Sequence, residues 1–471
     1  MLENLEPKIV WKYFEEICKI PRCSKHEEKI AEYIVEVAKN LGLEVERDEI
    51  GNVLVRKGAN GYENAPMITF QSHMDMVCEK NKDVEHDFSK DPIQPYVDGE
   101  WVKAKGTTLG ADDGIGVAIS LALMETKDIK HGPLEFLFTV DEETGLTGAF
   151  NLKKGFIKGK LLINLDSEDF GVIYIGCAGG GNSTIKLPLK YENVNGKGFR
   201  ITVKGLRGGH SGVEIHKGRA NAIKLLARIL YNINARISSV EGGDKHNAIP
   251  REAIAEVMVE GDIKEKIAEM EKEFRNEFSA SDPDIKIEVE ECSIEKVLDR
   301  ESNEKLLKMM MALPHGIIAM SQEVEGLVET STNFATIKTD DVAEVVMSSR
   351  SSINSALDGL MQSIRCIGEL AGAEVEEGSR YPGWKPNLNS RLLQIASDAF
   401  KELYGEEPKK LAIHAGLETG VIGDITGIDE IISIGPQIEH PHSPDERVNI
   451  KTVQEFWKYL IHLTEKVAKE W

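Results

Sequence analysis

The sequence predicts an α/β domain that is interrupted by an inserted α+β domain. Three observations support this prediction. Apolar strands alternate with helices in the first part of the chain, the texture changes after the glycine run 179–181, and the alternation returns after the turn-rich segment 381–386. We therefore expect an α/β domain with a mixed, mainly parallel sheet flanked by helices, built from residues 1–186 and 384–471. The inserted domain is expected over residues 187–383.

The first predicted helix follows a capping-box pattern. Ser24 and Glu27 stand three residues apart before an apolar repeat, the spacing at which their side chains can cap a helix. Apolar residues recur at helical spacing from Ile30 to Leu41, and Gly42 ends the pattern. Residues 43–55 then read as extended chain. A helix followed by an extended segment is therefore expected to open the α/β domain.

Three short apolar strands each end in polar residues of the kinds that bind metals. In open α/β sheets, ligands bind beyond the carboxyl ends of the strands, so these polar residues fall where a site is expected. A compact apolar helix, 115–124, follows a glycine-rich turn after the first of these strands. The strands and the residues that follow them are Met67–Gln71 with His73, Leu134–Val140 with Glu142 and Glu143, and Leu161–Leu165 with Asp166.

The central part of the chain predicts a different sheet, whose strands are separated by long helices. Residues 199–260 and 285–374 share a coarse strand–helix–strand rhythm, and the segment HNAI at 246–249 faintly echoes STNF at 331–334. An internal duplication is therefore a hypothesis for this domain. The predicted strands are 199–203, 253–259, 285–289 and 345–347, and the predicted helices are 220–237, 262–278 and 356–370. Beyond residue 384 we predict helices over 392–403 and from Val453, and strands over 411–413 and 431–434.

The charge balance argues against two classes of partner. The 471 residues include 57 Lys and Arg against 79 Asp and Glu, a formal net charge of -22. Nucleic acids and anionic membranes both demand basic surface, so neither is an expected partner. No apolar run approaches the roughly 20 residues that a membrane-spanning helix needs.

The start of the chain and the cysteines indicate a cytoplasmic protein. The segment MLENLEPKIVWKYF lacks the basic segment, apolar core and small-residue cleavage site of a signal peptide. The six cysteines are scattered and contain no CxxC spacing. A disulfide framework is therefore not expected, and reduced cytoplasmic thiols fit better.

His73 and Asp75 are the first candidate pair. On a strand, residues two apart place their side chains on one face. One ring nitrogen of His73 could then bind a metal while the other donates to Asp75, which fixes the tautomer and increases the basicity of the ligand. Alone, such a pair is more often part of a surface loop.

Asp112 and Asp113 stand among glycines just before a helix, in the segment Leu109–Gly116. Glycines let the backbone turn sharply, so a carboxylate could lie between two cations and bridge them with its two oxygens. A phosphate-binding loop is the rival reading, but two aspartates would repel a phosphate. A calcium loop is a second rival, but the DxDxDG spacing of its ligands is absent.

Four further residues complete the candidate set, and each has an ordinary alternative. Glu142 and Glu143 would point in different directions on extended chain, so one could bind metal while the other faces the substrate, although an acidic turn is the usual fate of such a pair. Asp166 could instead cap a helix. His442 lies between two prolines, either in a stiff loop that would hold a ligand still or in a histidine-rich surface loop.

Together, these imidazoles and carboxylates are what zinc, cobalt or manganese prefer as ligands. The segments that carry them are QSHMDMVCE, GTTLGADDGIG, FTVDEETGLTGA, LINLDSED, GGHSG and HSPDERV. In this order, and over essentially the whole chain, they resemble the dizinc aminoacylase/carboxypeptidase-type metallopeptidases. The resemblance implies a dizinc aminopeptidase-like catalytic domain and an inserted domain of the lid or dimerisation type.

The resemblance implies a centre of two divalent metal ions, with zinc as the expected metal and cobalt or manganese as alternatives. Asp112 would bridge the metals, and its peptide bond to Asp113 would be cis. His73 and Asp166 would bind opposite metals, and Glu143 and His442 would complete the two coordination shells. Asp75 would orient His73, and Glu142 would be the general base that deprotonates the bridging water and later protonates the leaving amine.

The inserted domain would contribute the remaining site residues. The resemblance implies that His210 stabilises the oxyanion, that Asn247 and Arg350 hold the carboxyl-terminal end of the substrate, and that Gly416 offers a backbone contact. From the sequence alone, the segment GGHSG around His210 could be merely a turn, and Arg350 could be part of a surface charge pair.

The expected function is metal-dependent hydrolysis of unblocked dipeptides by a metal-bridging hydroxide, with broad specificity or a preference for carboxyl-terminal histidine. The alternatives are an amidohydrolase that deacylates N-acyl amino acids and, from another class, a non-catalytic binding protein that retains the fold. Dipeptides are the expected partners, with no nucleic acid and no membrane. The chain is expected to be a homodimer or a monomer.

Overall fold

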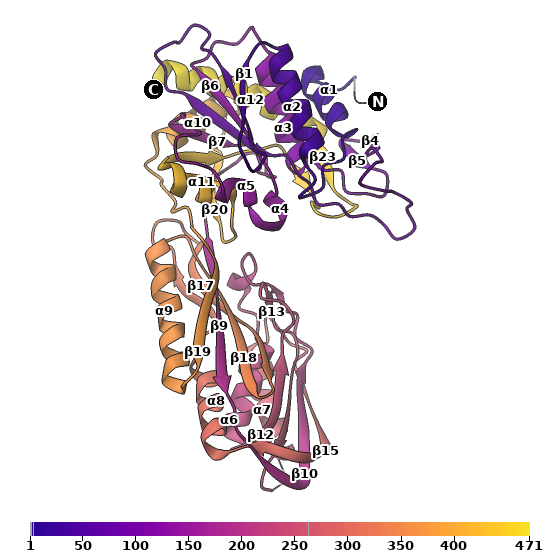
Figure 1. Ribbon diagram of the computed structural model, residues 1–471, viewed down its shortest axis with the longest axis vertical. Helices are drawn as coiled ribbons and strands as arrows, with labels where there is room; N and C mark the ends of the chain where they lie inside the picture. The colour runs from indigo at the N-terminus through magenta and orange to yellow at the C-terminus, as the bar shows by residue number, and fades with distance from the viewer. Residues whose placement is uncertain (1, 3, 262) are drawn as a thin grey trace. The chain divides into compact units, whose positions relative to one another are not determined.

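The computed structural model describes Leu2, residues 4–261 and residues 263–471, and it divides the chain into two compact units (Figure 1). Unit 1 comprises Met1–Gly176, Pro386–Ala412 and Leu417–Trp471. Unit 2 comprises Cys177–Lys385 together with Ile413–Gly416. Each unit has its own hydrophobic core. Within the described residues, no helix combines the length and the apolar character that crossing a bilayer requires.

Unit 1 is built on an eight-stranded mixed sheet with the order β1-β2-β6-β3-β7-β21-β8-β20. Its four central strands, β6, β3, β7 and β21, are parallel, and the pairs β1–β2, β2–β6 and β21–β8 are antiparallel. The mixed sheet with a parallel centre is the predicted one. The strands are β1 Glu44–Arg47, β2 Val53–Lys57, β3 Ile68–His73, β6 Leu134–Thr139, β7 Leu161–Asn164, β8 Val172–Cys177, β20 Lys409–Ile413 and β21 Glu430–Ser433.

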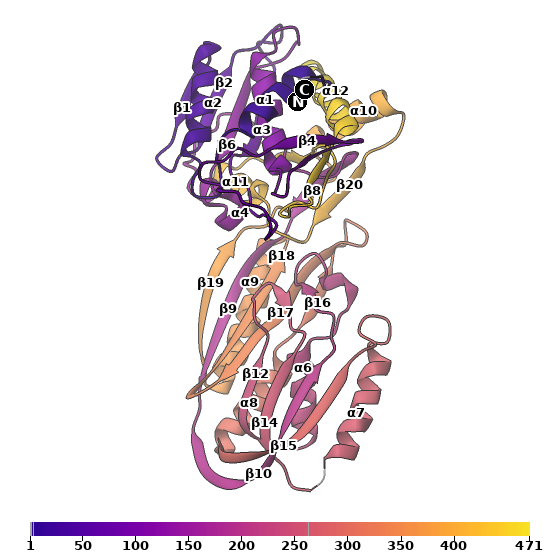
Figure 2. The same cartoon turned by 90° about the vertical axis from the view of Figure 1, so that its right-hand side faces the viewer.

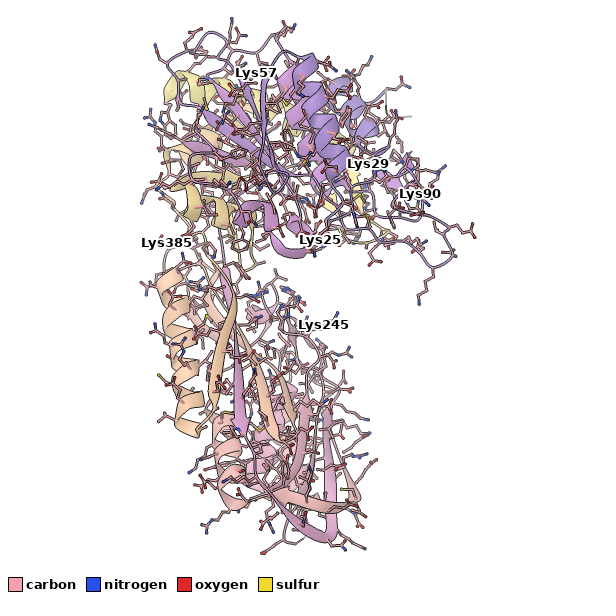
Figure 3. The ribbon with its side chains drawn as sticks, viewed as in Figure 1. Lys25, Lys29, Lys57, Lys90, Lys245 and Lys385 are labelled. Atoms are coloured by element: carbon pink, nitrogen blue, oxygen red, sulfur yellow. A yellow bond between two sulfur atoms is a disulfide. The ribbon has the colours of Figure 1, made fainter. Side chains whose placement is uncertain are left out.

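Helix α3 (Ala111–Glu125) packs directly on strand β3. Its sequence is apolar, and almost every one of its residues is buried. Each large apolar side chain buried in this way stabilises the fold by roughly 1.5–3 kcal/mol. Lys57, labelled in Figure 3, donates to the carbonyl oxygens of Leu123 and Thr126 at the end of α3, at 2.7 and 2.5 Å. Burial lowers the pKa of Lys57 to about 8. A cation at this position complements the negative end of the helix.

Other helices and a small second sheet complete unit 1. The small sheet has the order β22-β23-β5-β4. Its strands are β4 Pro95–Asp98, β5 Trp101–Ala104, β22 Ile438–Glu439 and β23 Arg447–Asn449. The helices are α1 Lys8–Ile17, α2 Glu28–Asn40, α4 Glu142–Gly145, α5 Thr147–Phe150, α10 Arg391–Tyr404, α11 Glu418–Thr426 and α12 Ile450–Glu470.

Unit 2 contains a nine-stranded sheet, with the order β15-β10-β14-β12-β17-β18-β9-β19 and with β16 paired to β17. Helices α6 to α9 pack against this sheet, and Figure 2 shows β9, β18 and β19 side by side. Its strands are β9 Gly179–Pro188, β10 Tyr191–Lys204, β12 Arg236–Gly242, β14 Ala253–Met258, β15 Lys286–Leu298, β16 Gly316–Met320, β17 Val328–Thr339, β18 Val342–Ser351 and β19 Glu374–Tyr381. The remaining elements are α6 Ala222–Asn232, α7 Lys264–Glu277, α8 Arg300–Ala312, α9 Asn354–Ala371, the short helix η1 Ile215–Lys217 and a strand pair, β11 Gly209–His210 with β13 Ala248–Ile249.

The first and last segments of unit 2 lie beside each other. The backbone N–H of Cys177 donates to the carbonyl oxygen of Trp384 at 2.9 Å, and the N–H of Trp384 donates to Cys177 at 3.0 Å. The boundary after Gly176 comes ten residues before the expected one at 186, because β9 belongs to the sheet of unit 2 through its pairing with β18 and β19.

Two local predictions were wrong. Ser24 does not cap α2; its hydroxyl donates to Asp75 Oδ2 at 2.8 Å. The helix predicted over 220–237 ends at Asn232, because Asn234 has a positive φ of 53° and β12 begins at Arg236. A left-handed residue ends the regular hydrogen bonding of a helix.

The structure also corrects the expectation that the cysteines are all reduced. Cys23 and Cys78 form a disulfide, although they are 55 residues apart and no CxxC spacing marks them. The bond joins the segment before α2 to the segment after β3. The same two segments are joined by the Met76 N–H, which donates to the Arg22 carbonyl at 3.1 Å.

Replacing both bridged cysteines, Cys23→Ser with Cys78→Ser, should lower the free energy of unfolding by about 4 kcal/mol, because the cross-link restricts a long loop in the unfolded chain. The measurement is urea unfolding with and without reductant. Reductant should lower the midpoint of the native chain and leave that of the double variant unchanged. Equal midpoints for the native chain in both conditions would show that the bond does not form in solution.

Candidate metal centre

The five predicted ligand side chains meet in unit 1, at the carboxyl ends of its parallel strands. His73 is the last residue of β3, Glu143 follows β6 and Asp166 follows β7. Asp112 comes from the first turn of α3, and His442 comes from the loop before β23. Strand ends collect these side chains because parallel strands finish at the same edge of a sheet.

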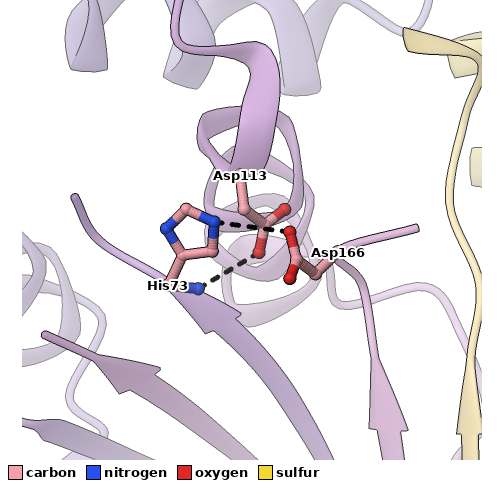
Figure 4. Close-up of side chains that lie close together, drawn as sticks. All are labelled: His73, Asp113 and Asp166. Carbon is pink, nitrogen blue, oxygen red and sulfur yellow. Dashed lines mark hydrogen bonds and ion pairs between the residues drawn. The ribbon is translucent and has the colours of Figure 1, made fainter. Parts of the chain in front are cut away.

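His73 forms the centre of one half of the cluster (Figure 4). Its Nε2 lies 3.1 Å from Asp112 Oδ1 and 3.3 Å from Asp166 Oδ1. Its backbone N–H donates to Asp113 Oδ2 at 3.1 Å. Asp113 therefore fixes the backbone of His73, while Asp112 and Asp166 converge on its ring.

His442 forms the centre of the other half. Its Nε2 lies 3.0 Å from Asp112 Oδ2 and 3.0 Å from Glu143 Oε2. Asp112 thus presents one oxygen to each imidazole, and the peptide bond between Asp112 and Asp113 is cis, as the resemblance implied. The geometry does not favour the expectation that His73 and Asp166 serve opposite metals, because the two side chains lie on the same side of Asp112.

The donor set fits two divalent cations. Two imidazoles and two carboxylates surround a shared carboxylate, which is a common arrangement for zinc, cobalt or manganese. Glu143 Oε1 is buried and has no hydrogen-bond partner among the described residues, so it has room for a ligand that the protein does not supply. The residues present therefore suit a dinuclear site.

The electrostatics indicate missing positive charge. Burial alone would lower the pKa of His73, but Asp166, Asp112 and Asp75 outweigh it and hold that pKa well above its usual value. Hydrogen bonds to Asp112 and Glu143 raise the pKa of His442 to about 11. Protons on the two imidazoles thus occupy the place that cations would take.

Asp75 connects the ligands to the rest of the unit. Its Oδ1 lies 3.3 Å from His73 Nδ1, and its two oxygens accept the backbone N–H groups of Glu142 and Glu143 at 3.0 and 3.2 Å. The partners of Asp75, among them His73, Glu142 and Ser24, outweigh its burial and hold its pKa at about 2. The Asp75 carboxylate therefore orients His73, a predicted metal ligand, and the backbone of Glu142 and Glu143, which follow strand β6.

Glu142 and Glu143 lie on a helical turn, α4, and not on the extended chain that was expected. The left-handed backbone of Asp141, with φ of 50°, turns the chain there. Neighbours on a helix still point in different directions, so Glu143 reaches His442 while Glu142 does not. Burial, with the nearby charges of Glu418 and Glu143, raises the pKa of Glu142 well above its usual value. A carboxyl group of this kind can hold and release a proton near neutral pH.

Three buried carboxylates beside the centre, Glu27, Asp75 and Asp141, also lie close enough to hold an ion. Their oxygens already accept hydrogen bonds from the protein: Glu27 from the Asp141 N–H at 3.0 Å, and Asp141 from the hydroxyls of Thr144 and Thr147. This second cluster is therefore explained by internal hydrogen bonding.

Two residues that sequence reasoning missed hold the turn before Asp112. Glu446 accepts backbone N–H groups of residues 109–112, and Arg22 donates to the carbonyl oxygens of Met74, Asp75 and Gly110. Both side chains are almost fully buried. In the sequence, Arg22 and Glu446 can be recognised only as charged residues close to candidate motifs. That position does not reveal hydrogen bonds to segments more than 50 residues away.

The four other predicted site residues, His210, Asn247, Arg350 and Gly416, all lie in unit 2. A Cβ atom added to Gly212 would stand 3.0 Å from His210 Cε1 and 3.1 Å from Arg350 Cζ, so these two side chains are neighbours. The Asn247 carbonyl accepts the N–H of Ser211 at 2.9 Å. A Cβ atom at Gly416 would meet the ring of Tyr381 at 2.8 Å.

The ring of His210 is held in one orientation. Its Nδ1 accepts the backbone N–H groups of Gly212 and Val213, both at 3.2 Å. Burial and the neighbouring charge of Arg350 lower the pKa of His210, so the ring is neutral at pH 7. Because Nδ1 accepts, the proton of the neutral ring belongs to Nε2, which is then a hydrogen-bond donor.

Arg350 is a buried cation for which the described residues supply no counter-ion. It is 9% exposed, its Nη1 donates to the Tyr381 hydroxyl at 3.2 Å, and its Nε has no partner among the described residues. No carboxylate of the described chain lies within 4.0 Å of its guanidinium. Its charge also contributes, after burial, to lowering the pKa of His414 to about 3. Such an arginine is suited to an anionic ligand.

Comparison with known proteins gives a consistent picture. Residues 69–466 match the model of peptidase family M20/M25/M40. The chain is 42% identical to the cytosol non-specific dipeptidase of Escherichia coli, over 99% of both sequences. It is also 42% identical to the aminoacylhistidine dipeptidase of Vibrio alginolyticus, whose crystal structure it matches with a TM-score of 0.93 over 99% of this chain and 98% of that one. The aminopeptidase PepT of Bacillus cereus, at 19% identity and a TM-score of 0.60, shares the fold.

Metal binding should release at least two protons per chain at pH 7, because neutral imidazole is the ligand and the pKa values of both histidines are raised in the metal-free fold. Isothermal titration calorimetry with zinc in buffers of different ionisation enthalpy measures this number, and affinity should increase with pH. The raised pKa values stabilise the metal-free fold fully below pH 6.5, the ordinary histidine value, and this contribution declines as the pH increases towards about 11 for His442. Identical heats in all buffers would contradict the prediction.

Proposed function

Because the chain belongs to peptidase family M20/M25/M40, we propose that it is a metallopeptidase that hydrolyses the peptide bond of unblocked dipeptides. Two relatives at 42% identity carry dipeptidase names and cover 99% of the chain. The observation that carries the proposal is the dinuclear ligand set of unit 1; unit 2, taken by itself, contains a buried arginine, Arg350. A peptidase of free dipeptides needs both a polarising centre and a receptor for the terminal carboxylate.

We infer that the centre holds two divalent metal ions, with zinc as the first choice and cobalt or manganese as alternatives. His73 and Asp166 would hold one ion, Glu143 and His442 the other, and Asp112 both. The ions would supply Lewis-acid chemistry, polarising the scissile carbonyl and making water a stronger acid.

Glu142 is the proposed proton carrier. Its carboxyl group is buried beside the ligands, and its raised pKa matches a group that must take a proton from water and return it to the leaving amine. Asp75 fixes the backbone of Glu142 by accepting its N–H at 3.0 Å. The base is therefore positioned by the same carboxylate that orients His73.

Unit 2 provides the proposed substrate contacts. Arg350 would bind the terminal carboxylate of the dipeptide, with Asn247 and the backbone of Gly416 beside it. The neutral ring of His210 would donate from Nε2 to the oxygen that gains charge when the carbonyl is attacked. Recognition of the carboxylate one residue beyond the scissile bond limits the substrate to a single residue after that bond.

The compartment follows from the same relationship. The Escherichia coli relative is named for the cytosol, and we propose that this chain works there too. Cytosolic thiol systems reduce accessible disulfides, and Cys23 and Cys78 are both partly exposed. The chain is therefore expected to meet conditions that favour its reduced form.

The substrate panel Gly-His, β-Ala-His, Leu-Gly, Leu-Gly-Gly and acetyl-Met tests the proposal, assayed with added zinc, with added manganese and after chelation. We expect metal-dependent cleavage of the dipeptides alone, in keeping with the dipeptidase names of the two relatives at 42% identity. Cleavage of acetyl-Met alone would keep the metal centre and assign the chain to deacylation. No turnover by a chain with two bound metals would reject both activities.

The change Glu142→Gln should lower kcat by about 10²–10⁴-fold, since a positioned proton carrier contributes this much. The number of bound metal ions should stay at the native value, because Glu142 is not among the proposed ligands. Metal analysis and steady-state kinetics on the same sample measure both quantities. Native kcat in the variant would eliminate Glu142 as the base.

The change Arg350→Ala should lower kcat/KM for Leu-Gly by about 10–150-fold, the loss expected for a charge-assisted hydrogen bond of 1.5–3 kcal/mol. The matched substrate is Leu-Gly amide, which lacks the carboxylate. Native and variant enzymes should process the amide at similar, low rates. An equal loss on both substrates would mean that Arg350 supports the fold and does not read the carboxylate.

A further inference from the structure

One buried carboxylate joins two loops that carry proposed metal ligands. Glu446 Oε2 accepts the backbone N–H groups of Leu109 and Gly110 at 2.8 and 2.9 Å. Its Oε1 accepts those of Ala111 and Asp112 at 2.7 and 3.2 Å. Glu446 is 2% exposed, so solvent competes little for these four bonds.

The four donors form the turn that leads into α3, and the last of them belongs to Asp112. Hydrogen bonds from backbone N–H groups to an ionised carboxylate are short and strong, and a negative charge at the start of a helix is favourable. Glu446 therefore fixes the backbone of Asp112, and through it the orientation of the Asp112 side chain.

Glu446 also belongs to the loop of the second imidazole. It lies four residues after His442, and its own N–H donates to the Ser443 carbonyl at 3.0 Å, which closes a tight turn. The chain then enters β23 at Arg447, which pairs with β5. The loop of His442 is thus bound to the turn of Asp112 through one side chain.

The two ligands of the other half that are not shared, His73 and Asp166, are held by different contacts. His73 belongs to β3, which is paired on both sides with β6 and β7, and Asp166 follows β7 directly. Arg22 holds the segment after His73 through the carbonyls of Met74 and Asp75. His442, in contrast, has a side chain that is 50% exposed and lies outside the eight-stranded sheet.

We propose that Glu446 is a positioning residue that sets the affinity of one half of the centre, the half formed by Glu143 and His442. It holds His442 at the distance where it can share the Asp112 carboxylate with His73. This inference rests on the dinuclear centre proposed above, and it adds that the two halves differ in what keeps them in place.

The test is the variant Glu446→Gln, in which an amide N–H faces two backbone N–H groups that the native oxygen accepts. Glu430→Gln is the matched control. Glu430 also accepts N–H groups at the start of a helix, from Arg391 and Leu392 at 3.3 and 2.9 Å, but it is not part of the centre. Metal-free samples of each are titrated with zinc and, separately, with Co²⁺, whose absorption spectrum reports the coordination geometry.

We expect two metal ions to bind to the native chain and to the control variant. In Glu446→Gln, one ion should bind with native affinity and the second about 10–100-fold more weakly, as for other residues that orient ligands. The Co²⁺ spectrum should change for the second equivalent alone. Activity should recover at excess metal, with KM for Leu-Gly unchanged.

Each other outcome has a definite meaning. Native affinity for both ions in Glu446→Gln would overturn the inference, as would equal weakening of both ions. A native chain that binds fewer than two ions would instead reject the dinuclear centre itself. If Glu446→Gln does not fold, Glu446→Asp keeps the charge and shortens the reach; it should weaken the second ion selectively, and native affinity there would overturn the inference.

Discussion

The Asp112 carboxylate, shared between two imidazoles, is the contact on which the centre of unit 1 depends. Each of its oxygens faces one ring, at 3.1 Å from His73 and 3.0 Å from His442. Around it stand further buried carboxyl groups that would repel one another if all were ionised. Protonated imidazoles and backbone N–H groups reduce this repulsion. One carboxylate oxygen, Glu143 Oε1, has no hydrogen-bond partner among the described residues and could bind a cation. In the metal-free fold, protons and backbone N–H groups offset the excess negative charge, and bound cations would offset the same charge.

The sequence predicted the parts of this centre that are encoded locally. The apolar strands ending at His73, Glu142 and Asp166 could be recognised, because burial selects continuous apolar residues and the edge of a parallel sheet follows from topology. The roles of Ser24, Arg22 and Glu446 could not, because each acts through a hydrogen bond to a distant segment. The disulfide was missed for the same reason, since two cysteines 55 residues apart carry no spacing signal.

The boundary of the inserted unit shows how a local signal can mislead. The glycine run 179–181 reads as a break between domains, yet these residues open β9. A Cβ atom at Gly180 would stand 2.5 Å from the ring of Tyr381, so glycine is required there by a packed aromatic side chain and not by a turn. Residues 199–260 and 285–374 both contribute strands to one continuous sheet. The hypothesis that these two segments arose by duplication stays a prediction.

The hydrogen-bonded ends of the inserted unit have an evolutionary consequence. Cys177 and Trp384 exchange two backbone hydrogen bonds, so the two ends of a segment of about two hundred residues lie side by side. A gene could gain, lose or exchange this segment without re-ordering the strands of the catalytic sheet. Residues 413–416, from the later part of the chain, also belong to this unit, and the Ala178 N–H lies 3.1 and 3.0 Å from the Ile413 and Ala415 carbonyls. Substrate choice and bond cleavage could then diversify at different rates within one lineage.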